Sequence, residues 1–160
     1  MHFEAQAQHE WLLRLVGNWT FEGTCLAGPD MPETVSRGKT AIRSLGKAWI
    51  LCEGVSDMPN GEPGYSIITL GYDTAKQEFV GSFVGSMMSN MWIYEGTLDA
   101  DEKILTLDTI GPSFTGTGSA PYQDIIEVVD NNHWILRSQV KGENGEWTQF
   151  MTGHYRRVQG

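Results

Sequence analysis

Short strand patterns follow one another along almost the whole chain, and no helical stretch separates them. In each pattern Val, Ile, Thr, Tyr, Phe or Trp recur, and Gly, Pro, Asn or Asp mark the breaks between patterns. Parallel strands need a long crossover, usually a helix, so short connections predict antiparallel neighbours. We expect about ten strands, at residues 18–26, 36–45, 48–55, 65–73, 78–85, 91–98, 104–109, 122–129, 133–141 and 146–158.

Several of the breaks have the chemistry of tight hairpin turns. Residues 73–76, 99–102, 130–132 and 143–145 are rich in Asp, Asn and Gly, which suit such turns. A long meander leaves two exposed edges unless it closes on itself. We therefore predict an all-β fold, an antiparallel up-and-down β-barrel. A chain of 160 residues fits one domain over residues 1–160, with the barrel at 18–158.

The N-terminal segment has a different periodicity. Trp11, Leu12, Leu15 and Val16 have the spacing of one helical face. Gly17 is a natural helix stop. We expect one short helix over residues 5–16.

Alternation within the strands predicts which side chains face the barrel interior. In the first strand Trp19, Phe21, Gly23 and Cys25 share one face. Glycines among inward aromatics bend strands and leave space, so we expect a cavity. The longer connections, at 27–35, 56–64 and 110–121, are expected to form its rim or lid. Aromatics and glycines also alternate in two later strands, at Phe79, Gly81, Phe83 and Gly85, and at Trp92, Tyr94, Gly96 and Leu98.

Charge and composition exclude several classes of partner. The formal net charge is -9 and the 11 Lys and Arg residues are scattered, whereas nucleic-acid binders need a basic stripe. Anionic membranes are disfavoured for the same reason. The first residues lack the pattern of a signal peptide, and no apolar run is long enough to span a bilayer, so we expect a cytoplasmic protein. Cys25 and Cys52 fit that compartment as free thiols in apolar strands.

Specific motifs distributed over the chain resemble a known family. The Gly17-Asn18-Trp19 segment after a leading helix is similar to the Gly-x-Trp signature of calycin barrels. With the further motifs, the chain resembles the bacterial domain-of-unknown-function 1579 family, whose members are compact calycin-like barrels. These further motifs are Arg43-Ser44-Leu45-Gly46, Leu70-Gly71-Tyr72-Asp73, Val84-Gly85-Ser86-Met87-Met88, Tyr94-Glu95-Gly96-Thr97-Leu98, Gly111-Pro112-Ser113-Phe114 and Met151-Thr152-Gly153-His154-Tyr155-Arg156-Arg157.

The resemblance implies a fold and a class of ligand. The wider calycin group includes lipocalins, fatty-acid-binding proteins and haem-binding nitrobindins, which implies small hydrophobic ligands held inside the barrel. In lipocalins the Trp is covered by a basic residue from the last strand, a cation–π contact. Gly17, Trp19, Tyr155 and Arg157 are therefore assigned to closure of one barrel end. No catalytic residue is implied, because the family has no established reaction.

The residues themselves suggest where a ligand would lie. The stretch from Met87 to Trp92 combines methionines with Trp, an adaptable apolar surface. We expect a small, largely apolar molecule in the barrel, held by polar contacts from a few inward residues. The orientation of Arg43, Glu95, Asp108 and Arg137 stays open. The expected lining is Arg43, Trp49, Glu53, Tyr72, Met87, Met88, Trp92, Tyr94 and Phe114.

Other functions remain open. An isomerase or lyase would need an inward carboxylate, for which Glu53 with Tyr94 is the candidate pair. Haem is a minor alternative, because His154 lies in the last strand, as does the haem-ligating His of nitrobindin-like barrels. Alternation turns His154 outward, however, if Arg157 reaches Trp19 inside the barrel. The four histidines show no zinc-site spacing, so no metal and no resident cofactor are expected. Exposed Met and Trp side chains could also form a homodimer face.

Overall fold

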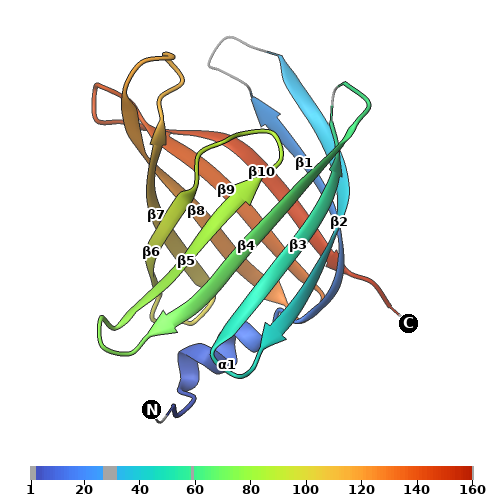
Figure 1. Ribbon diagram of the computed structural model, residues 1–160, viewed down its shortest axis with the longest axis vertical. Coiled ribbons are helices and arrows are strands. Elements are labelled where there is room, and N and C mark those ends of the chain that lie inside the picture. Colours follow the sequence, from blue (N-terminus) through green and yellow to red (C-terminus); the bar gives the residue numbers. More distant parts are fainter. Residues whose placement is uncertain (1–2, 27–31, 59, 160) are drawn as a thin grey trace.

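The strands close into one barrel whose sheet has no free edge (Figure 1). The computed structural model describes residues 3–26, 32–58 and 60–159. Within that part of the chain, ten strands pair antiparallel with their neighbours in sequence, and the first also pairs with the last. The elements are α1 (Ala7–Leu13), β1 (Gly17–Leu26), β2 (Glu33–Leu45), β3 (Trp49–Asp57), β4 (Pro63–Asp73), β5 (Glu78–Gly85), β6 (Trp92–Leu98), β7 (Ile104–Pro112), β8 (Ser119–Asp130), β9 (His133–Lys141) and β10 (Trp147–Arg157).

The helix is shorter than the sequence pattern predicts, since it ends at Leu13 and not at Val16. The backbone N–H groups of Leu15 and Val16 donate to the carbonyls three residues earlier, so the last turn tightens. Gly17 then turns the chain into β1 with a φ of 142°, in the region that favours glycine. Within the described residues, no helix is long and apolar enough to cross a membrane.

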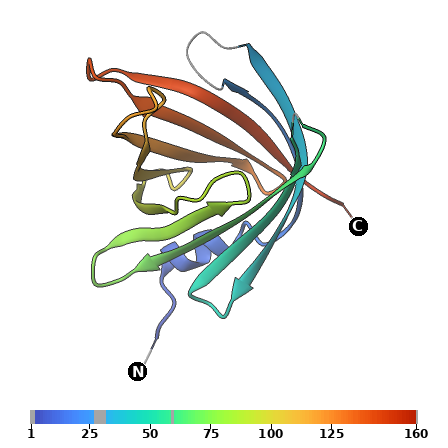
Figure 2. The same ribbon diagram turned by 45° about the horizontal axis from the view of Figure 1, so that its top comes forward.

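One barrel end is closed by α1 (Figure 2). The Trp11 indole donates to the Glu102 carbonyl in the β6–β7 turn at 2.6 Å. His9 Nδ1 accepts the backbone N–H of Gln6 at 2.9 Å, so Nε2 carries the proton and donates to the Tyr72 carbonyl at 3.0 Å. These bonds fix the helix against the end of β4 and the β6–β7 turn, and the helix buries its own Trp11 and Leu12 in the barrel core.

Arg157 completes the closed end in the way expected of a calycin barrel. Its guanidinium lies 4.3 Å from the centre of the Trp19 ring. The same group donates to the carbonyls of Val16 at 2.7 Å and Arg14 at 3.0 Å, which lie just beyond the helix. A Cβ at Gly17 would lie 2.4 Å from Arg157 Nη1, so the glycine leaves room for the guanidinium. Trp19 itself is 1% exposed.

Tyr155 also packs with the aromatic side chains of the closed end, and it lines the open end of the barrel as well. Its ring stacks on Trp134 at 3.7 Å, and Trp134 in turn contacts Trp19 edge to face. The aromatic layer therefore extends from the closed end upward to Tyr155. Beyond Tyr155, toward the open end, several inward side chains are small, among them Ser36 and Gly38.

Candidate ligand-binding site

The open end of the barrel holds a cavity of about 370 Å³. It lies among the inward side chains of β1 to β5 and of β9 and β10, at the barrel end opposite α1. Its apolar lining includes Phe21, Ile68, Phe83 and Leu136, and Tyr155 contributes its ring and phenol. Binding sites for small molecules typically have about this size and this apolar character.

The cavity exists because the inward positions of three neighbouring strands are small. At the open end of β2 the inward residues are Ser36, Gly38 and Thr40. The register aligns Gly38 with Ser56 of β3, and Ser56 with Gly64 of β4. Side chains of this size cannot fill the space that Leu or Phe would fill, so the wall is thin here.

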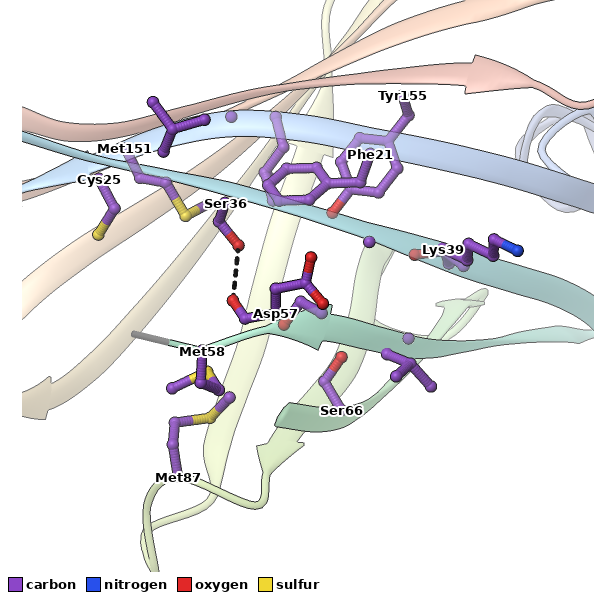
Figure 3. A pocket seen from close by; sticks show the side chains of 18 of the residues that line it. Phe21, Cys25, Ser36, Lys39, Asp57, Met58, Ser66, Met87, Met151 and Tyr155 are labelled. Carbon is purple, nitrogen blue, oxygen red and sulfur yellow. Dashed lines mark hydrogen bonds between the residues drawn. The ribbon is translucent and has the colours of Figure 1, made fainter. Parts of the chain in front are cut away.

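Methionines surround the mouth of the cavity. Met58, Met87 and Met151 all line it (Figure 3). Inward glycines make room for two of them: a Cβ at Gly85 would lie 2.4 Å from Met87 Sδ, and one at Gly64 would lie 2.7 Å from Met58 Sδ. Methionine side chains are flexible and polarizable, so they can adjust to ligands of different shape.

Phe21 and Tyr155 form the inner wall side by side (Figure 3). Their ring centroids are 4.9 Å apart. A Cβ at Gly153 would lie 2.0 Å from Phe21 Cε2, so this glycine lets the Phe21 ring lie against the sheet. Burial raises the pKa of the Tyr155 phenol, and the nearby Cys52 and Asp124 raise it further. Tyr155 therefore keeps its proton and presents a neutral O–H.

Deeper in the barrel, a buried carboxylate is bound by two hydroxyl groups. The Ser138 hydroxyl donates to Asp124 Oδ1 at 2.5 Å, and the Tyr94 phenol donates to Asp124 Oδ2. Burial raises the pKa of Asp124, while the hydrogen bonds from Ser138 and Tyr94 lower it. Burial also raises the pKa of Tyr94 well above its ordinary value, and the charge of Asp124 adds to this. The cluster is a satisfied polar network inside the barrel.

Aromatic side chains occupy much of the other half of the open end. Trp92 of β6 packs edge to face on Tyr122 of β8 at 4.9 Å, and Phe114 from the β7–β8 loop packs on Phe150 at 5.0 Å. The β10 register shifts between Gln149 and Met151, and such a bulge redirects side chains. Phe150 consequently reaches Tyr122 as well. A second hollow of about 360 Å³ lies beside these rings, lined by Phe114, Ala120, Val140 and Phe150.

Three of the residues predicted to line the cavity lie on the outer surface, and these predictions are wrong. Arg43 and Glu53 form an exposed ion pair, with Arg43 Nε 3.0 Å from Glu53 Oε1. Trp49 is 40% exposed and packs across Gly71, where a Cβ would lie 2.4 Å from the Trp49 ring. Alternation groups Trp49, Leu51 and Glu53 correctly, but this face of β3 points outward because Ile50 and Cys52 occupy the core.

The other predicted residues point inward or lie at the rim, in different places. Met87 lines the cavity. Trp92 and Phe114 belong to the aromatic half of the mouth, and Met88 accepts the Trp92 indole N–H through its sulfur at 2.9 Å. Tyr72 lies at the closed end, beside Phe79 and His9. Tyr94 is bound to Asp124, so the proposed Glu53–Tyr94 pair does not form.

Of the strand residues whose orientation was left open, Glu95 and Asp108 lie on the outer face. Arg137 is half-buried, with its Nη1 2.6 Å from Glu127 Oε1. His154 hydrogen-bonds His133 between ring nitrogens 2.9 Å apart, and the two rings stack. His154 lies with Glu22 and Arg156 on the outer surface, as alternation predicts.

Sequence reasoning missed the small residues that create the cavity, Ser36, Ser56 and Ser66, together with Met58 and Met151. A usable signal was present. Successive inward positions in neighbouring strands were all Ser, Thr or Gly on one side of the barrel and aromatic on the other. The size of inward residues, compared across the sheet, locates the space better than unusual local composition does.

Comparisons with known proteins agree with this architecture. A family model described as "Protein of unknown function (DUF1579)" matches residues 4–157. No curated protein matches the chain. Among solved structures, Rv2717c from M. tuberculosis has a TM-score of 0.68 at 12% identity, over 98% of this chain and 100% of that one.

Two further structures share the fold at low identity. The S-type phycobiliprotein lyase CPES from Guillardia theta has a TM-score of 0.59 at 15% identity, over 95% of this chain and 93% of that one. A protein named EF1p2_mFAP2b, bound to DFHBI, has a TM-score of 0.51 at 14% identity, over 95% of this chain and 100% of that one. At such identities these likenesses show the fold alone.

Proposed function

The chain belongs to the DUF1579 family, and we propose that this member binds a small, largely apolar molecule in the open end of its barrel. The observation that carries the proposal is the cavity of about 370 Å³ beneath a rim of methionines. A folded protein ordinarily fills its interior to crystal-like density. Here the inward glycines and serines of β2 to β4 keep space open instead. A barrel of similar fold is bound to DFHBI, so the architecture is compatible with a small-molecule ligand.

The lining fits an apolar body better than a polar one. Phe21, Ile68, Phe83 and Leu136 present carbon to the space, and burial of apolar ligand surface there contributes about 25 cal/mol per Å². The serine and threonine hydroxyls give a few polar contacts, which is the usual division in small-molecule sites. The Asp124 carboxylate is bound by Tyr94 and Ser138, so a carrier role follows from the geometry more directly than catalysis.

A fluorescence titration tests the proposal. The apolar dye N-phenyl-1-naphthylamine is expected to bind the native protein with enhanced emission and to be displaced by small apolar molecules. Ser66→Phe places a ring in the cavity and is expected to weaken dye binding at least about tenfold. Ile68→Phe fills a neighbouring position and serves as a second test.

The matched control is Thr97→Phe, which puts the same ring on the exposed outer face of β6. It is expected to leave dye binding unchanged. Circular dichroism and urea midpoints establish that each variant is folded. Undiminished dye binding in folded Ser66→Phe and Ile68→Phe would contradict the proposed site.

We also propose that the outer face of β4 to β6 contacts a second copy of this chain. Tyr65, Ile67, Val84 and Ile93 are 55%, 41%, 37% and 57% exposed there, and Ile67 pairs with Val84 across the strands. An apolar face on a chain of net charge -9 offers a region where two copies can meet without opposing like charges.

Light scattering after size exclusion tests this assembly. The expected mass is that of a dimer, and Ile67→Glu is expected to give a monomer. Val35→Glu, at an exposed apolar position on β2, is the control and is expected to stay dimeric. A monomeric wild-type protein at the same concentration would overturn the assignment.

A further inference from the structure

The location of the basic side chains decides whether the cavity can bind an anion, because a buried carboxylate needs a cationic partner. All 11 Lys and Arg residues of the chain lie within the described residues, so each can be located. Five basic residues lie away from the two faces of the sheet: Arg14 after the helix, Lys47, Lys76 and Lys103 in the turns of the closed end, and Arg157 over Trp19. The outer-face residues are Arg37, Lys39, Arg43, Arg137, Lys141 and Arg156.

Several of these cations are already paired away from the cavity. Ion pairs hold Arg37 to Glu22, Arg43 to Glu53 and Arg137 to Glu127. None of these guanidiniums can neutralise a charge in the barrel interior without leaving its partner and passing through the sheet.

Lys39 is the basic residue that comes nearest to the cavity, and it counts among the lining residues. Its neighbours Gly38 and Thr40 occupy inward positions of β2, so Lys39 leaves the strand on the outer side and is exposed. Figure 3 shows its ammonium directed away from Phe21 and Tyr155. Lys39 therefore borders the cavity through its backbone and stem.

Two acidic residues lie at or near this space. Asp124 lies deep in the barrel near Tyr155, and Asp57 lies at the mouth, where its carbonyl accepts the Ser36 hydroxyl at 3.4 Å (Figure 3). An anion brought into this space would find no cation among the described residues and would meet the negative charge of Asp124. Burying an unpaired carboxylate is costly in free energy.

The cavity does offer neutral hydrogen-bonding groups. Within the described residues the Tyr155 phenol has no hydrogen-bond partner, although its ring is packed between Phe21 and Trp134. Ser56 and Ser66 add further hydroxyls to the lining. A hydroxyl can donate and accept, so these groups suit a ligand hydroxyl or carbonyl.

Resting on the proposed function, we infer that the cavity selects a neutral molecule, an apolar body carrying a hydroxyl or carbonyl group, and rejects the corresponding carboxylate. The selectivity comes from the location of the basic side chains and from the neutral phenol of Tyr155 in the lining.

Displacement of N-phenyl-1-naphthylamine by a matched pair tests the inference. Decan-1-ol and decanoate have the same chain length and differ in the charge of one end. At pH 8 the alcohol is expected to bind at least about tenfold more tightly than decanoate. The difference is expected to shrink as the pH falls toward the pKa of the fatty acid, because decanoic acid then becomes neutral.

A cation introduced into the cavity should reverse this preference. Met151 lies among the inward residues at the mouth, and Lys has a similar length. Met151→Lys is expected to raise decanoate affinity at least about tenfold, whereas the neutral Met151→Gln is not. Lys39→Gln tests whether the border lysine supplies a cation to the ligand, and the preference for decan-1-ol over decanoate is expected to remain.

The outcomes separate the two proposals. If neither the dye nor decan-1-ol binds, the proposed function fails. If the dye and both ligands bind with equal affinity at pH 8, or if Lys39→Gln abolishes decanoate binding, the proposed function stands and the inference about charge is overturned.

Discussion

The two ends of the barrel are built from the same alternating strands and differ in what occupies the inward positions. At the closed end those positions carry Trp19, Phe79 and Leu105, each at most 1% exposed. At the open end Ser36 and Ser66 stand in equivalent inward places. The comparison indicates that the closed end supplies stability and the open end supplies the binding site. Substitutions at the two ends should therefore separate stability from binding.

Removing Trp19 should have the largest effect. Trp19→Ala deletes a buried ring that contacts Trp134 and Arg157, and we expect a loss of about 3–5 kcal/mol in the free energy of unfolding. Urea denaturation measures it. The matched control is Trp49→Ala on the outer face, where a loss of about 1 kcal/mol is expected. Equal losses in the two variants would contradict both the distinction between the two ends and the role of Trp19 in closing the barrel.

Arg157 should have the next largest effect. Arg157→Ala loses the cation–π contact with Trp19 and the hydrogen bonds to Val16 and Arg14, and we expect a loss of about 1–3 kcal/mol. Its neighbour Arg156 lies exposed on the outer face, so Arg156→Ala should change stability by less than about 0.5 kcal/mol. Dye binding should survive in the folded population of both variants.

Asp124, which lies between the two ends, should make the free energy of unfolding depend on pH. Burial raises its pKa in the folded state, so the folded protein holds the proton more readily than the unfolded chain. Its stabilising contribution is therefore greatest at pH values below the unfolded pKa and is lost as the pH rises through the folded pKa. Relative to Asp124→Asn, wild-type stability is expected to fall as the pH rises above the unfolded pKa of about 4.

Asp99 provides a control of opposite sign at the closed end. Hydrogen bonds from the backbone N–H groups of Ile104 and Lys103 lower its pKa. Relative to Asp99→Asn, the stabilising contribution of wild-type Asp99 is expected to be fully present above the unfolded pKa and to be lost as the pH falls through the lower folded pKa. Urea midpoints over a pH series that extends below about 4 measure both residues. A parallel response in the two variants would contradict the burial of Asp124.

The two thiols should give the smallest and most local signal. Burial raises the pKa of the Cys52 thiol to about 12. Burial also raises the pKa of the Cys25 thiol, which lines the cavity and is less completely buried. With Ellman's reagent Cys25 is expected to react first, and decan-1-ol is expected to slow it. Cys25→Ser and Cys52→Ser identify the reacting thiol. Faster reaction of Cys52 in the native protein would contradict its placement in the core.

The sequence predicted the fold well because strand periodicity and turn chemistry are local properties. The ten strands and the inward alternation at Trp19, Phe79 and Tyr94 follow from them. Alternation could not decide which face of β3 is inner, since Trp49 and Ile50 are both large and apolar. Pairing of Cys52 with Ile42 and Ile68 decides it, and that pairing is a property of the closed sheet.

The candidate site was predicted less well than the closed end for a related reason. A closed end is made of groups that are present, such as Trp19 and Arg157, and these leave a motif in the chain. A cavity is made of groups that are small, such as Gly38, Ser56 and Gly64, and they become informative only when the register sets them side by side across neighbouring strands. Met58 and Met151 reach the mouth from loops and strands far apart in sequence.

The most direct measurement of the central claim is a crystal structure of the protein with 10-bromodecan-1-ol, with the bromine located by its anomalous signal. The expected result is a bromine peak inside the open-end cavity, among Phe21, Ser66, Met151 and Tyr155, at one ligand per barrel. Bromine bound only on the outer surface, with the cavity closed by its own side chains, would contradict it.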